Sequence, residues 1–383
     1  MLLTIFRRQF VNRYLIREEC IFCNHKLNYH LFDNDLKTYV SHYAVEENQD
    51  VHLIPYNILI CDKCNTPQIK YLGDIGEVYK VNHADGTGST MKMMHETKLK
   101  LLLKYKDKVN GILEIGSSKG ILSDLILENL KTDYYIVEPF YFGSRTGKYI
   151  FDDYYENIDD TQIEANTLIM SHVFEHFYNP LIILEKIKNN TNIENIFLTF
   201  PNFEQYIVED IHHVVNTEHT FYVDNKFLEN LFYNYGFKLV ETNLYKSHSI
   251  IFYFSRSSDD IQKNELTNNL DNFYSYFDRL KSSVNKFNQI INQNSHRNIY
   301  MFPASCHSIF FSIFGLEYQK LYGMVDNSPN KIGKKVYGLD TKIYSFKEVV
   351  KGKDNPIILI NGGIFNEEIE DELKNNNIEY YSV

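Results

Sequence analysis

The 383-residue chain has no tryptophan, few cysteines and prolines, and no uninterrupted run of about 18 apolar residues. The missing apolar run excludes a membrane-spanning helix, and arginines interrupt the N-terminal stretch MLLTIFRRQF, which a signal peptide would keep apolar. A basic excess is also absent, because 39 lysines and arginines face 50 acidic residues and the net charge is −11. This balance argues against a general nucleic-acid binder. We therefore expect a cytoplasmic protein that binds neither membranes nor nucleic acid.

Four of the five cysteines form two C-x-x-C pairs near the N-terminus: Cys20 and Cys23 in CIFC, and Cys61 and Cys64 in CDKC. Two such turns supply the four thiolates of a closed tetrahedral zinc site, which leaves no open position for chemistry. Disulfides are disfavoured in a cytoplasmic chain, and a single redox pair would leave the second pair unexplained. We predict a structural Zn²⁺ site, with unliganded core thiols as the alternative. A small sheet is expected between the pairs, and Cys306 is expected to serve packing.

After the cysteine pairs, short apolar runs alternate with segments that have helical spacing. Strands are expected at 111–115, 134–138, 166–170 and 196–201, and helices at about 96–105, 119–130, 180–189 and 226–236. Such alternation predicts a parallel, doubly wound sheet. The segments LVETNLY and SIIFYFSR, around 239–256, are expected to close it as an antiparallel pair.

A second α/β unit is expected near the C-terminus. The Asn-rich stretch 257–297 has the apolar spacing of a long connecting helix. Strands are then expected at 298–302, 320–326 and 356–360. The length of the chain agrees with several domains.

Residues 111–125, GILEIGSSKGILSDL, predict a strand, a tight turn of small residues and the start of a helix. The free backbone N–H groups of such a turn suit an anionic or polar end of a cofactor. A dinucleotide site would carry three glycines as G-x-G-x-x-G, whereas only Gly116 and Gly120 are present here. An S-adenosylmethionine site tolerates this pattern and usually has an acid two residues before the first glycine, where Glu114 stands. We therefore assign Glu114, Gly116, Ser117 and Gly120 to the cofactor loop.

Residues at the carboxyl ends of the other strands are expected to complete the cofactor site, because ligands bind there in doubly wound sheets. Glu138 ends the second strand, and its carboxylate can accept two hydrogen bonds from ribose hydroxyls. Asp152 or Asp153 would reach an adenine amino group, unless FDD is only a solvated acidic turn.

The segment SHVFEHFYNP follows the strand expected at 166–170 and gathers four polar side chains near the cofactor. Of the four, Ser171 and His172 are assigned to cofactor binding. The other two, Glu175 and His176, are expected to lie beside them. The alternative is that the histidines are structural.

The paired cysteines, EIGSSKG, VEP and SHVFEHF together resemble the class I methyltransferases, and more closely the three-domain sugar C-methyltransferases that contain zinc. That resemblance implies a central class I methyltransferase Rossmann-like doubly wound sheet, a small N-terminal zinc domain and a C-terminal Rossmann-like α/β domain. Proteins of that family act on nucleotide-linked 4-keto sugars. The expected parts are a zinc domain at 1–88, a methyltransferase domain at 89–257, a connecting helix at 258–297 and a substrate-binding domain at 298–383.

NTEHTFY, residues 216–222, is similar to the family motif YHEHxxY, so Glu218, His219 and Tyr222 match. An imidazole titrates near neutral pH, so His219 suits the base that removes a proton beside the substrate carbonyl. His176 matches a family active-site histidine and would act with it. Glu218 would hold a substrate hydroxyl, and Tyr222 would donate a hydrogen bond. The alternative is a turn packed on the sheet.

Four positions depart from the family motifs: Asn216 and Thr217 replace Tyr and His, and Ser118 and Lys119 replace Asn and Asp. The segment 325–338 resembles a stretch of the family's C-terminal domain, which helps hold the nucleotide end of the substrate.

We predict an S-adenosylmethionine-dependent enzyme that C-methylates a nucleotide-linked keto sugar. A sugar O-methyltransferase on the same scaffold is the first alternative, favoured by Lys119 and Asn216. A non-catalytic binding scaffold is the second, and the intact cofactor loop argues against it. A dehydrogenase is opposed by the glycine pattern.

Overall fold

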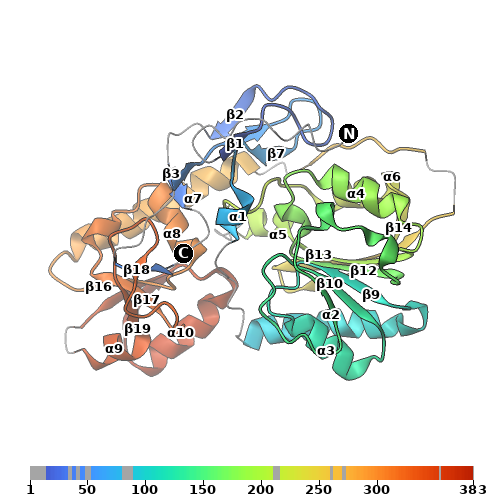
Figure 1. Ribbon diagram of the computed structural model, residues 1–383. Coiled ribbons are helices and arrows are strands. Elements are labelled where there is room, and N and C mark those ends of the chain that lie inside the picture. The colour runs from blue at the N-terminus through green and yellow to red at the C-terminus, as the bar shows by residue number, and fades with distance from the viewer. Residues whose placement is uncertain are drawn as a thin grey trace.

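The computed structural model describes residues 14–32, 37–39, 44–47, 53–79, 89–209, 216–258, 262–269, 273–352 and 355–382. Two α/β units and a group of short N-terminal strands make up these residues (Figure 1). The stretch MLLTIFRRQF, which was judged unlike a signal peptide, lies outside the described residues. So do residues 80–88, just before the domain boundary expected at residue 89. Within the described part, no helix is both long and apolar enough to cross a membrane.

Short antiparallel strands form the N-terminal part and fill the interval between the cysteine pairs, as expected. They are β1 (Tyr14–Ile16), β2 (Tyr29–Phe32), β3 (Lys37–Tyr39), β4 (Ala44–Val45), β5 (Leu53–Pro55), β6 (Ile58–Ile60), β7 (Pro67–Ile69) and β8 (Tyr71–Gly73). Strand β6 pairs with β2 and β7, β1 pairs with β8, and β3 pairs with β5. A short helix, α1 (Ile75–Val78), follows.

The central sheet has seven strands in the order β11-β10-β9-β12-β13-β15-β14. Their bounds are β9 (Ile112–Ile115), β10 (Tyr134–Val137), β11 (Tyr149–Phe151), β12 (Thr167–Ser171), β13 (Asn195–Pro201), β14 (Phe237–Tyr245) and β15 (Ser249–Arg256). Strands β9 to β13 are parallel, and β15 pairs antiparallel with both β13 and β14. The expected alternation and the closing antiparallel pair are thereby confirmed, and the sheet is mixed.

Helices cover both faces of this sheet (Figure 1). They are α2 (Ser89–Lys104), α3 (Ile121–Asn129), α4 (Pro180–Asn189), α5 (Phe203–Val208) and α6 (Asn225–Asn234). Neighbouring residues of β9 belong to separate cores: Ile112 lies in the core that includes Leu122 of α3, and Leu113 in the core that includes Ile183 of α4. Burial on both faces explains why β9, β12 and β13 are apolar almost throughout. Because strands β9 to β13 are parallel, their carboxyl ends all lie at one edge of the sheet.

The C-terminal unit contains five parallel strands in the order β19-β17-β16-β20-β21. Its elements are α7 (Phe273–Gln293), β16 (Ile299–Phe302), α8 (Cys306–Ile313), β17 (Gly323–Asp326), β18 (Lys335–Val336), β19 (Ile343–Ser345), α9 (Phe346–Lys351), β20 (Ile357–Ile360), α10 (Asn366–Asn375) and β21 (Glu379–Ser382). Helix α7 covers only part of the connecting helix expected at 258–297, because residues 262–269 are not helical, and its buried face packs into the main core. Strand β18 pairs with β4, which joins this unit to the N-terminal part.

Candidate functional site

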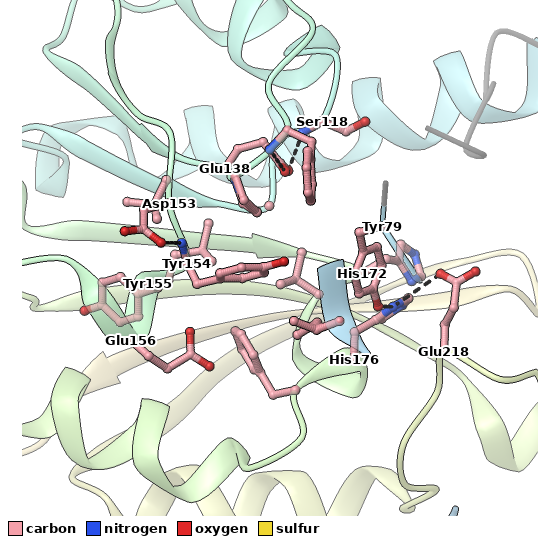
Figure 2. Close-up of a pocket in the computed structure, with 18 of the residues that line it drawn as sticks. Tyr79, Ser118, Glu138, Asp153, Tyr154, Tyr155, Glu156, His172, His176 and Glu218 are labelled. Atoms are coloured by element: carbon pink, nitrogen blue, oxygen red, sulfur yellow. Dashed lines mark hydrogen bonds and ion pairs between the residues drawn. The ribbon is translucent and has the colours of Figure 1, made fainter. Parts of the chain in front are cut away.

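A cavity of about 230 Å³ opens where β9, β10 and β12 end (Figure 2). Its wall combines the region of α1, the loops that follow β9 to β12, and the segment before α6. The lining residues are Ile75, Tyr79, Ile115, Gly116, Ser118, Val137, Glu138, Pro139, Phe140, Phe142, Asp153, Tyr154, Tyr155, Glu156, His172, Val173, His176, Phe177 and Glu218.

The loop after β9 depends on backbone conformations that favour glycine. Gly116 has φ +76° and Gly120 has φ +71°, and a Cβ atom on Gly116 would lie 2.3 Å from a methyl carbon of Val173. Both the left-handed conformation and the close approach therefore require glycine at 116. Gly116 lines the cavity, whereas Gly120 caps the start of α3 and lies outside the lining.

Glu138, at the end of β10, lines the cavity beside this loop (Figure 2). Its two carboxylate oxygens accept backbone hydrogen bonds from Ser118 and Phe140, each at 3.0 Å. Burial raises the pKa of Glu138 above its ordinary value, and the two hydrogen bonds oppose that rise. Because each carboxylate oxygen carries a further lone pair, the oriented side chain can still accept hydroxyl hydrogen bonds from a ligand.

Glu114 and Ser117 support the loop from beneath and do not line the cavity. Glu114 is almost fully buried and accepts hydrogen bonds from Ser117 Oγ at 2.8 Å and Tyr134 OH at 2.9 Å. Both residues were assigned to cofactor binding from the sequence. In the structure they belong to a hydrogen-bond network that holds the loop in shape.

The acidic turn after β11 faces the cavity with only one of its two aspartates. Asp153 lines the cavity and accepts hydrogen bonds from the Tyr154 backbone at 2.7 Å and from Asn157 at 2.8 Å. Asp152 instead forms an exposed ion pair with Arg145 at 2.6 Å. Of the two, Asp153 is the residue that can meet a ligand.

A buried lysine that sequence reasoning missed lies beneath the end of β12. Lys98 of α2 donates a hydrogen bond to Ser171 Oγ at 2.5 Å. Burial lowers the pKa of Lys98 to about 8, although Glu114 and Glu175 act in the opposite direction. Ser171 is thus bound to Lys98 and lies outside the cavity lining. Nothing in the sequence around Lys98 distinguishes it from the other lysines of α2.

His172 lines the cavity with a left-handed backbone, φ +55°. Its Nδ1 lies 3.2 Å from Glu175 Oε1, and its Nε2 lies 2.9 Å from Ser249 Oγ. Burial holds the pKa of His172 well below its ordinary value. The imidazole is therefore neutral near pH 7 and is oriented at both nitrogens.

A second histidine, His176, meets a tyrosine from the N-terminal part (Figure 2). Tyr79 OH lies 2.7 Å from His176 Nδ1, and Glu218 Oε2 lies 3.5 Å from the same nitrogen. His176 Nε2 lies 3.8 Å from Glu175 Oε1. Sequence reasoning missed Tyr79, because no motif surrounds it and only the fold brings it to the cavity.

The segment 216–222 is held as a turn by Asn216, whose side-chain oxygen accepts the backbone N–H groups of Glu218 and His219, both at 2.8 Å. Glu218 faces the cavity. His219 is nearly buried behind it, with its ring 5.2 Å from that of His176.

Tyr222 lies in the core, away from the cavity lining. Its hydroxyl donates to the carbonyl of Asn216 at 3.3 Å and lies 3.4 Å from Tyr56 OH. The N-terminal part anchors this segment, because Tyr222 N donates to the carbonyl of Pro67 and Arg17 donates to that of Thr220. Among the predicted catalytic residues, the structure therefore brings Glu218 and His176 to the cavity, with His219 behind them.

The four paired cysteines are thiols that cluster outside this cavity. Cys20 and Cys64 have sulfurs 3.5 Å apart, as do Cys23 and Cys61, and all four sulfurs lie within 4.8 Å of one another. A hydrogen bond with Cys64 lowers the pKa of Cys20 to about 5. Such a set of thiols, three of them buried, could hold a metal ion.

Residues 92–242 match the family model described as a methyltransferase domain. The protein is an S-adenosylmethionine-dependent methyltransferase. The matched range contains the Gly116 loop, Glu138 and both cavity histidines. A comparison of the sequence with curated proteins finds no match.

Several solved methyltransferase structures resemble the enzyme. Magnesium protoporphyrin IX methyltransferase from Synechocystis PCC 6803 is 11% identical, with 44% of this chain and 84% of that chain covered and a TM-score of 0.35. The N-methyltransferase NodS from Bradyrhizobium japonicum WM9 is 10% identical, with 46% and 91% covered and a TM-score of 0.34. 1,6-didemethyltoxoflavin-N1-methyltransferase from Burkholderia thailandensis is 10% identical, with 53% and 96% covered and a TM-score of 0.36. At this degree of similarity, the substrates of these enzymes do not transfer to this one.

Proposed function

We propose that the enzyme transfers a methyl group from S-adenosylmethionine to a carbon atom of a nucleotide-linked keto sugar. The observation that carries this proposal is the cavity itself, in which Glu138 and Gly116 face the same space as Glu218 and His176. A cofactor site and a candidate proton acceptor are thus adjacent. The motifs of the N-terminal part and of residues 216–222 support the choice of a keto sugar, through their resemblance to sugar C-methyltransferases.

The residues around the cavity fit S-adenosylmethionine. Glu138 is oriented to accept ribose hydroxyls, Asp153 lies where it can meet the adenine amino group, and the Gly116 turn admits a close backbone approach. When bound, the cofactor supplies an electrophilic methyl group on sulfur. The enzyme's part is to orient the reactants and to exclude water.

C-methylation needs a base and an adjacent carbonyl, because the carbon must lose a proton before it attacks the methyl group. Glu218 is the acceptor that the geometry favours, since it lines the cavity and lies 3.5 Å from His176 Nδ1. Tyr79 holds the same imidazole nitrogen from the other side. His219, the base inferred from the motif, lies behind these groups and remains the second candidate.

A sugar O-methyltransferase is the second function that we consider. Asn216 replaces a motif tyrosine, and its side chain is used to cap the turn that carries Glu218 and His219. A hydroxyl substrate would need a base but no partner for an enolate oxygen.

We also propose that Cys20, Cys23, Cys61 and Cys64 bind one structural Zn²⁺. The sulfur separations suit a tetrahedral four-thiolate site. Matching turns support it, because Asn24 and Asn65 follow the two pairs with positive φ and donate to the carbonyls of Cys20 and Cys61. By this proposal the ion stabilises the strands that anchor residues 220–222. The C-terminal unit is proposed to hold the nucleotide.

Mass spectrometry of products from a panel of nucleotide-linked sugars tests the proposed function. Each sugar is supplied with and without a 4-keto group. A gain of one carbon-bound methyl group only on keto sugars is expected. Methylation of a sugar that has no carbonyl would favour the O-methyltransferase, and no methylation of any sugar would overturn both.

A further inference from the structure

Glu175 is a buried acid to which the proposed reaction gives no task. It is 0% exposed, and its Oε1 lies near His172 Nδ1 and His176 Nε2. Its second oxygen, Oε2, is buried without a hydrogen-bond partner. A buried acceptor without a partner is unfavourable, more so when it is charged, and a bound cation would remove this cost.

We propose that Glu175, His176 and His219 bind a divalent transition-metal ion beside the cavity. Each of the three residues offers one ligand atom, and these atoms all lie within 4.8 Å of one another. Two ligand atoms of one tetrahedral ion at about 2.1 Å lie about 3.4 Å apart, so side-chain shifts of about one ångström complete the site. Two imidazoles and one carboxylate suit ions such as Fe²⁺, Co²⁺ or Zn²⁺ and leave positions open for substrate.

The surroundings of His176 favour this role. Ligating histidines usually hold their second nitrogen in a hydrogen bond, which fixes the ring orientation. Tyr79 OH, 2.7 Å from His176 Nδ1, provides that contact and leaves Nε2 directed toward Glu175. Tyr79 would then act as a positioning residue for the ligand.

The charge of the cavity also favours a cation. Four carboxylates, those of Glu138, Asp153, Glu156 and Glu218, line it, and no lysine or arginine occurs among its described lining residues. The nearby ammonium group of Lys98 is bound to Ser171 beneath the cavity. An enolate oxygen formed beside these acids would find no lysine or arginine partner among the described lining residues.

The role of the ion rests on the proposed function, whereas its binding does not. The substrate carbonyl oxygen would occupy an open position on the ion, which acts as a Lewis acid. Glu218 accepts the proton, the C–H electron pair becomes the enolate, and the enolate carbon attacks the methyl group as the carbon–sulfur bond breaks. His219 is then a ligand, and the base role falls to Glu218.

Titration of Co²⁺ into the full-length, zinc-loaded protein tests the site, with calorimetry and visible absorption as readouts. We expect one additional Co²⁺ per chain, with the weak visible bands of nitrogen and oxygen ligands and without thiolate charge-transfer absorption. Glu175→Gln and His219→Ala should each weaken binding by at least the 10–100-fold typical of a lost supporting contact. Glu156→Gln, which changes another cavity carboxylate outside the cluster, should bind Co²⁺ like the wild type.

No additional Co²⁺ up to millimolar concentration, or equal affinity in folded Glu175→Gln and His219→Ala variants, would overturn the site. Circular dichroism establishes that each variant is folded. If one of the two ligand variants does not fold, the other still tests the site. Activity separates this inference from the proposed function. Full methylation of a keto sugar after chelation of the second ion would overturn its catalytic role and leave the function standing. Metal binding without methylation of any sugar would leave the metal site standing and overturn the proposed function.

Discussion

Tyr79 and His176 meet at the cavity, with the tyrosine hydroxyl 2.7 Å from the imidazole Nδ1, although 97 positions separate them in the chain. Tyr79 follows α1 in the N-terminal part, whereas His176 belongs to the loop after β12. The N-terminal part therefore supplies a wall of the cavity and orients one of its histidines. It is a component of the candidate active site as well as a carrier of four thiols.

Replacement of this hydroxyl should weaken turnover. Tyr79→Phe is expected to lower kcat about threefold to tenfold, the scale of one neutral hydrogen bond, because His176 loses a fixed orientation. Steady-state kinetics measure the effect, and the affinity for S-adenosylmethionine should not change. Tyr71→Phe, in β8 of the same part, is the matched control. An unchanged kcat in Tyr79→Phe would show that this contact does not matter for the reaction.

Glu138 should contribute strongly to cofactor affinity. Glu138→Ala is expected to lose about 1.5–3 kcal/mol of binding free energy for S-adenosylmethionine, as for hydrogen bonds to a charged group. Isothermal titration calorimetry measures the loss. Asp152→Asn, an exposed acid paired with Arg145, should bind the cofactor normally. Equal affinities of Glu138→Ala and the wild type would remove Glu138 from the site.

The four clustered thiols should hold one zinc ion per chain. Cys61→Ser is expected to lose more free energy of unfolding than free energy of cofactor binding, because metal binding contributes to folding free energy. Metal analysis and thermal denaturation are the measurements. Cys306→Ser, which changes the cysteine outside the cluster, should keep both the zinc and the stability. Freshly purified wild-type protein without zinc would contradict the assignment.

Proton removal can be observed apart from methyl transfer. A keto sugar incubated in heavy water with S-adenosylhomocysteine should exchange one carbon-bound hydrogen. Glu218→Gln should lose exchange and methylation together by about 10²–10⁴-fold, as expected for a positioned base, while cofactor binding survives. His219→Gln tests the second candidate. Normal exchange in Glu218→Gln together with loss in a His219→Gln protein that retains its second metal would return the base role to His219.

The buried ammonium group of Lys98 predicts a pH effect on stability. Its pKa is about 8 in the folded protein and near 10.5 when unfolded, so the unfolded state binds more protons between these values. Stability contributed by this group therefore rises as pH increases from 8 to 10.5, by on the order of 3 kcal/mol. Urea denaturation of the wild type and Lys98→Met at pH 7.5 and pH 10 isolates the change. A stability difference between the two proteins that is independent of pH would contradict this prediction.

Local sequence signals predicted much of the architecture. The helix expected at 180–189 forms over those residues, because Asn179 caps it and Pro180 suits its first turn. The strand that ends at Ile115 and the glycine turn after it were also predictable, since buried strands are apolar and Gly116 adopts φ +76°. The clustering of the cysteines followed from their paired spacing.

The directions of individual side chains were less predictable. Glu114 and Ser117 were assigned to the cofactor but hydrogen-bond to each other beneath the loop. Tyr222 matched a catalytic motif but lies in the core. A motif specifies residue types along the chain, whereas the facing of each side chain depends on the packing of the turn that carries it.

The succession of strands and helices and the glycine turn at Gly116 could be predicted from the sequence alone, because they depend on neighbours within one turn or one strand. The four-cysteine cluster could be predicted because two C-x-x-C pairs suit one metal ion. Which polar groups share the cavity depends on tertiary packing. Lys98 reaches Ser171 across 73 positions, and Tyr79 reaches His176 across 97. Such contacts arise when separate strands and helices pack around one core, and no local pattern records them.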